Sequence, residues 1–119
     1  MLADERVAPR VVLVATHYAP RRRDGSPDAW LHGLENADAF LEVCARHPRA
    51  AILHGHIHWR YHLGLRGLPP MFGAGSVTDA GREGLWLFEL DAGTLRATPG
   101  AWRGDAYALD RSATVEPWG

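Results

Sequence analysis

Three histidines occupy alternate positions directly after a short apolar segment, in the run His54-Gly55-His56-Ile57-His58. Imidazole is a common ligand for zinc and also suits manganese and iron. Three imidazoles within five residues, beside a glycine that lets the backbone turn tightly, favour a metal site over solvent-facing polar residues. In extended backbone they would share one face, but a turn at Gly55 would separate them. We therefore expect the three histidines to have different roles.

A further histidine follows a second apolar segment. Val11–Ala15 is apolar and β-branched without alternation, which predicts a strand buried on both faces, and it is followed by Thr16-His17. Ala50–Leu53, after the breaker pair His47-Pro48, predicts a second buried strand. Ligands of open α/β sheets bind at the carboxyl ends of the strands. We therefore expect His17 and His56 to lie near one crevice.

The segment between these strands predicts a loop and a helix. Residues 21–33 are rich in arginine, aspartate, glycine and proline, as in a long surface loop, and Arg21-Arg22-Arg23 is interpreted first as a solvated run, with phosphate binding as the alternative. Asn36 is the expected N-cap of a helix that ends before His47-Pro48. Its buried positions are Ala37, Phe40, Leu41 and Cys44. The two strands and the helix then form a right-handed β-α-β unit.

The rest of the chain predicts short strands separated by glycine and proline. The candidates are Arg60–Leu65, Met71–Ser76, Leu85–Leu90 and Thr94–Thr98, followed by a weakly patterned edge strand and tail over residues 105–119. Asp91-Ala92-Gly93 predicts a tight hairpin. Trp86, Phe88 and Trp102 are expected to pack against a sheet. The predicted fold class is mixed α/β: β-α-β followed by antiparallel strands.

The length and composition exclude several classes of protein. A chain of 119 residues with a net charge of −1 predicts a single domain, residues 1–119, that is not a general nucleic-acid binder. The single cysteine, Cys44, fits a reducing compartment and is expected in the core. Apolar runs such as Val11–Ala15 are too short for a membrane span or a signal peptide. We expect a cytoplasmic protein that makes no membrane contact.

Three motifs together resemble a known family. His17-Tyr18-Ala19-Pro20 after the first strand, Gly55-His56-Ile57-His58 after the second, and Gly73-Ala74-Gly75-Ser76 before the later strands resemble the C-terminal half of calcineurin-like metallophosphoesterases. The resemblance spans residues 10–98. It implies part of a four-layer α/β/β/α sandwich. It also implies hydrolysis of a small phosphomonoester or phosphodiester by a metal-activated water.

The resemblance also implies roles for individual histidines. His17 and His56 match ligands of one divalent ion, and His58 matches a ligand of a second ion; manganese, iron or zinc would serve. His54 matches a position that is not a ligand and would brace the loop. The resemblance implies no catalytic residue in this chain beyond the metal ligands.

The chain departs from the family in its carboxylates. The family's Asp-x-His, Gly-Asp-x-x-Asp and Gly-Asn-His-Asp/Glu motifs are absent, and Gly104-Asp105 lacks the second aspartate. Three imidazoles cannot complete two sites that each need four or more ligands.

Two hypotheses follow from this departure. The first is the C-terminal portion of a phosphohydrolase, completed by an N-terminal half. The second is a non-catalytic remnant or interaction module that keeps a partial metal site, with another copy of the chain as a candidate partner. A cupin is disfavoured, because Trp59-Arg60-Tyr61-His62 supplies no glutamate after the histidines.

Overall fold

The computed structural model describes residues 10–26 and 36–118. The elements in chain order are β1 (Val12–Thr16), α1 (Ala37–Ala45), β2 (Ala50–His54), β3 (Tyr61–Leu63), β4 (Met71–Gly73), β5 (Gly84–Asp91), β6 (Thr94–Trp102), β7 (Tyr107–Leu109) and the 3-10 turn η1 (Arg111–Ala113). Each strand or helix falls within or next to a predicted segment. The first two strands after His58 are shorter than predicted: β3 ends before Gly64, and β4 ends at Gly73.

The first sheet has the strand order β1-β2-β4-β3. Strands β1, β2 and β4 are parallel, and β3 is antiparallel to β4. The predicted pairing of the first two strands is confirmed, with Val14 opposite Ile52. Helix α1 packs on one face of this sheet, where Leu41 and Cys44 meet Ile52 and Met71. Cys44 is fully buried, as expected for a core residue.

The second sheet is antiparallel, with the order β5-β6-β7. The predicted hairpin is confirmed: the two-residue turn Ala92-Gly93 between β5 and β6 has positive φ at both positions, 50° and 81°. This sheet packs on the face of the first sheet opposite α1. Phe72 of β4 lies in edge-on contact with the rings of Trp86 and Phe88. The predicted packing role of these two residues is therefore confirmed.

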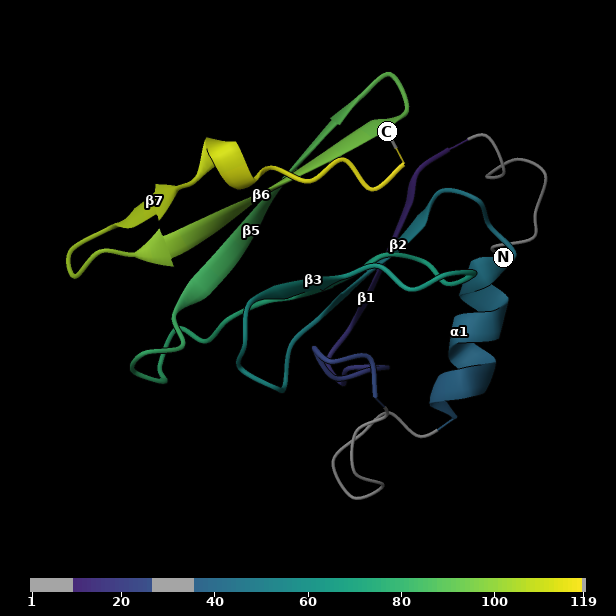
Figure 1. Cartoon of the computed structure of the whole chain (residues 1–119), viewed down its shortest axis with the longest axis horizontal. Coiled ribbons are helices and arrows are strands. Elements are labelled where there is room, and N and C mark those ends of the chain that lie inside the picture. Colours follow the sequence, from purple (N-terminus) through teal and green to yellow (C-terminus); the bar gives the residue numbers. More distant parts are fainter. Residues whose placement is uncertain (1–9, 27–35, 119) are drawn as a thin grey trace.

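The described residues thus form three layers, a helix and two sheets. Figure 1 shows α1 on the right, the first sheet in the centre and β5–β7 on the left. This is a mixed α/β fold with one mostly parallel and one antiparallel sheet, as predicted. The division of the chain into a single domain stays a prediction.

Two local predictions, the burial of the first strand and the packing of Trp102, are wrong, and a third, the N-cap, is confirmed in its position. The first strand is not buried on both faces, because β1 is an edge strand and its side chains alternate between half-buried and exposed, with Leu13 37% exposed. The predicted N-cap position is confirmed at Asn36, but its backbone is left-handed and its side chain makes no capping hydrogen bond; its carbonyl accepts from the Phe40 N–H. Trp102 is 42% exposed, and its ring contacts Tyr107 of the edge strand.

Candidate functional site

The two predicted histidines at strand ends lie in contact. Strands β1 and β2 are parallel neighbours, so their carboxyl ends meet at one edge of the sheet. There the Gly55 N–H donates to the His17 carbonyl at 3.1 Å. The His17 Nε2 and the His56 Nδ1 are 3.3 Å apart, and the Tyr18 ring contacts both imidazoles. The fold therefore brings together two nitrogens from residues 39 positions apart.

The loop after β2 holds its histidines in an unusual backbone conformation. His56 and His58 have φ values of 66° and 65°, in the left-handed region. Such values are uncommon for residues other than glycine and cost free energy, so they persist where the surrounding structure enforces them. The turn expected at Gly55 is made at His56 and His58 themselves. As expected, the three histidines are not equivalent.

The spacing of the first two histidines fits a shared metal ion. Two nitrogens bound tetrahedrally to zinc at about 2.0–2.1 Å are about 3.3–3.4 Å apart. The nitrogens of His17 and His56 have this separation. Yet the described residues contain no group of three or more histidine, cysteine or acidic side chains able to hold a metal. The pair could supply two ligands of an ion whose remaining ligands come from water or from another protein segment.

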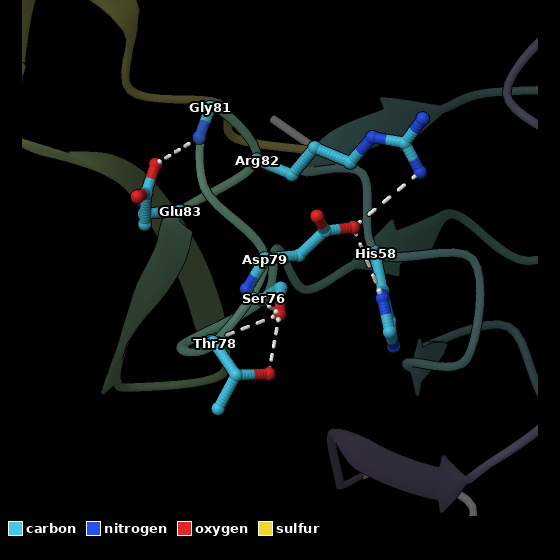
Figure 2. A network of polar contacts seen from close by, with 7 residues as sticks. All are labelled: His58, Ser76, Thr78, Asp79, Gly81, Arg82 and Glu83. Carbon is cyan, nitrogen blue, oxygen red and sulfur yellow. Dashed lines mark hydrogen bonds and ion pairs between the residues drawn. The ribbon is translucent and has the colours of Figure 1, made fainter.

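His58 faces a different neighbour. Its Nδ1 lies 3.4 Å from the Asp79 Oδ2, and the same oxygen lies 3.6 Å from the Arg82 Nη1 (Figure 2). Ser76 fixes this loop, because its hydroxyl oxygen accepts from the N–H groups of Thr78 and Asp79. His58 therefore pairs with a carboxylate. The role of His17, His56 and His58 as metal ligands stays a prediction.

His54 is a buried residue of β2. It is 4% exposed, its ring lies 5.2 Å from that of Tyr61, and its Nδ1 is 3.4 Å from the Gly55 carbonyl oxygen. Burial lowers the pKa of His54, and it also lowers that of His62, which stacks on Phe72. The Nε2 atoms of both histidines are buried without a hydrogen-bond partner among the described residues. The sequence analysis predicted loop bracing for His54 and assigned no role to His62.

We predict that acid destabilises the chain through His54 and His62. Because their folded-state pKa values lie below the unfolded value of 6.5, the unfolded chain binds more protons just below this pH. The free energy of unfolding is therefore highest above about pH 6.5 and falls as the pH decreases toward the lowered values. Urea unfolding at a series of pH values measures this, and His62→Gln should flatten the slope. An unchanged slope in that variant would contradict the prediction.

A cavity at the other end of the sheet lies away from the histidine pair. Its volume is about 390 Å³, and its lining includes Ala50 and Pro70 at the amino ends of β2 and β4, with His62 and Trp118. His17 and His56 lie beyond the carboxyl ends of the strands. The described structure thus has a cavity at one end of the sheet and the histidines at the other.

The arginine run is not uniformly solvated. Arg21 donates to the Pro20 carbonyl and pairs with Asp38 of α1 at 2.5 Å, whereas Arg23 stacks on the ring of Trp59. Sequence reasoning missed Trp59 and Asp79. The position of Trp59 directly after His58 was a signal that could have marked it; nothing in the sequence marked Asp79.

The comparisons with known proteins are sparse. No family model matches the chain, and a search of curated proteins finds no match. The chain resembles a solved structure of wild-type Vps29 complexed with zinc, from Entamoeba histolytica, at 14% identity and a TM-score of 0.50, over 75% of this chain and 50% of that one. A second structure, of a Vps29 double mutant from the same organism, matches at 16% identity and a TM-score of 0.44, over 63% of this chain and 46% of that one.

These similarities concern the fold. The chain spans about half the length of the solved structures it matches. In the part of the chain that the structure describes, no helix is long and apolar enough to cross a membrane. With its helix layer and its parallel and antiparallel sheets, the chain has the mixed α/β architecture of the metallophosphoesterase sandwich, which Vps29 shares.

Proposed function

We propose that this chain is a non-catalytic interaction module that pairs through β1 with an extended segment of a partner protein and retains a partial metal site at His17 and His56. The observation that carries the proposal is the position of β1. It lies at the end of the first sheet, and no strand among the described residues pairs with its outer side. Such an edge offers unpaired N–H and C=O groups to another strand.

The exposed side chains of β1 give that edge an apolar surface. Leu13 and Ala15 are exposed and lie opposite Ala51 and Leu53 of β2. Leu53 also lines an apolar cavity of about 180 Å³ between the two sheets. A partner strand beside β1 would cover Leu13 and Ala15 and continue the first sheet. This combination of main-chain pairing and apolar contact supports strand addition by a protein partner.

The chemistry of the histidine site also supports a non-catalytic role. A two-metal hydrolase needs carboxylate oxygens to hold two cations close together. His17 and His56 provide two imidazole nitrogens, and Asp79, the carboxylate beside His58, is already paired with Arg82. The Vps29 structure complexed with zinc supports metal binding by this fold.

We predict that the isolated chain associates through β1, with a second copy acting as the partner segment. In sedimentation experiments over a wide concentration range, Leu13→Lys should weaken association by about tenfold or more, or 1.4 kcal/mol, because it places a charge on the pairing surface. Val77→Lys is the matched control, since Val77 is 83% exposed and lies outside β1. A wild-type chain that stays monomeric, or two variants that associate equally, would refute the proposal.

A second candidate is the C-terminal portion of a phosphohydrolase acting on small phosphate esters. The contact between His17 and His56 favours it, since this pair matches two ligands of one ion in the resembled family. Metal-dependent turnover of a nitrophenyl phosphodiester by the 119-residue chain, abolished by His56→Ala, would support it over the interaction module.

A further inference from the structure

We infer that Arg23, Trp59 and Arg82 form a binding site for a phosphate monoester. The guanidinium carbons of Arg23 and Arg82 lie 4.3 and 4.6 Å from the centroid of the Trp59 ring. The two guanidinium groups repel each other, because both are cations and both lie against one ring. A bound anion would neutralise this repulsion, so the site is suited to an anion. The site lies beside His58, the sequence neighbour of Trp59.

Stacking leaves the hydrogen-bonding edge of a guanidinium free. A guanidinium that lies over an aromatic ring uses its face, and its in-plane N–H groups stay available for bidentate contacts with phosphate oxygens. Within residues 10–26 and 36–118, the Arg23 side chain makes no hydrogen bond or ion pair. Its donors are therefore open to a ligand while the guanidinium lies over the Trp59 ring.

A hydrogen-bonded turn positions Arg23. The Arg22 N–H donates to the Ser26 carbonyl at 2.7 Å, and the Gly25 N–H donates to the Arg22 carbonyl at 2.8 Å. Asp24, the acidic neighbour of Arg23, accepts from both the N–H and the hydroxyl of Ser26. Its carboxylate is thus directed to the turn.

A second turn positions Arg82. The Ser76 N–H donates to the Arg82 carbonyl at 2.8 Å, and the Arg82 N–H donates to the Asp79 carbonyl at 3.0 Å. In Figure 2 the Arg82 side chain extends past Asp79 toward His58. Arg23 and Arg82 come from segments about sixty residues apart, and each is held by main-chain bonds. The cluster is therefore built into the fold.

The charges indicate the class of ligand. Asp79 is the carboxylate at this cluster, at 3.6 Å from Arg82, and it offsets only one of the two guanidinium charges. A phosphate monoester carries close to two negative charges at neutral pH and three strong acceptor oxygens, so its charge and its acceptors match two arginines. This inference does not depend on strand addition or on a bound metal, since it uses neither β1 nor the His17–His56 pair.

The test is a titration followed by NMR, using the indole N–H signal of Trp59. Inorganic phosphate, phenyl phosphate and a phosphoserine peptide are added at constant ionic strength with EDTA present, which excludes metal effects. We expect saturable shifts with phosphate compounds and weaker binding of chloride. The compound that binds most tightly identifies the source of the phosphate group as free phosphate, a small ester or a phosphoprotein.

Four variants make the test specific. Arg23→Gln should weaken phosphate binding by about tenfold or more, and Arg23→Lys should recover only part of it, because lysine keeps the charge but lacks the planar fork. Asp79→Asn should strengthen binding several-fold, because it removes the competing carboxylate while the main-chain bonds of the turn remain. Arg96→Gln, opposite Glu89 in the second sheet, is the charge-matched control and should bind as the wild type does.

Each variant is first checked for the wild-type pattern of amide signals. Absence of saturation, equal affinity in Arg23→Gln and wild type, or an equal loss in Arg96→Gln would overturn the inference.

Discussion

Phe72→Ala is expected to lower the free energy of unfolding by about 3–5 kcal/mol, the range for a large aromatic side chain removed from a core. Phe72 is 1% exposed and is the largest fully buried side chain among the described residues. Its ring contacts Trp86 and Phe88 of the second sheet and stacks on His62 of its own sheet. Because its ring joins the two sheets, the substitution leaves a cavity at their interface.

Urea unfolding followed by circular dichroism measures this loss. Leu90→Ala is the matched control, since Leu90 lies on β5 but is 56% exposed, and its removal should cost less than about 1 kcal/mol. The hydrogen bond from the Trp86 indole N–H to the Gly73 carbonyl, at 3.0 Å, also joins the sheets and should limit separation in the variant. Equal losses in the two variants would show that the sheets are not held together at Phe72.

Zinc is expected to bind the chain detectably, and His17→Ala or His56→Ala should each weaken binding by about a hundredfold, or 2.7 kcal/mol. The reason is that each substitution removes one of the two nitrogens that converge, 3.3 Å apart. His58→Ala should have a smaller effect, because His58 faces Asp79. Isothermal titration calorimetry with zinc chloride measures all three variants against the wild type.

The same samples test for catalysis. Without a carboxylate bridge the chain lacks the paired clamp on attacking and leaving oxygens, and each 1.4 kcal/mol of lost transition-state stabilisation is about tenfold in rate. We expect no more than trace hydrolysis of a nitrophenyl phosphodiester. Undiminished zinc affinity in both His17→Ala and His56→Ala would show that the metal lies elsewhere.

The sequence by itself predicted the order and type of most elements. Apolar runs such as Ala50–Leu53, the helical spacing of Leu41 and Cys44, and the turn residues Ala92-Gly93 are local signals, and local backbone preference and burial agree in each case. The contact of His17 with His56 also followed from a local argument, because two adjacent parallel strands must end at the same edge.

Tertiary structure alone decided what surrounds those elements. An apolar run cannot show whether its strand lies inside a sheet or at its edge, so Val11–Ala15 gave no sign that Leu13 would be exposed. Asp79 and Arg82, which contact His58 and Trp59, come from a loop about twenty residues later, and no periodicity links them to these two residues. Such pairings depend on where the chain returns in space, which is set by the packing of both sheets.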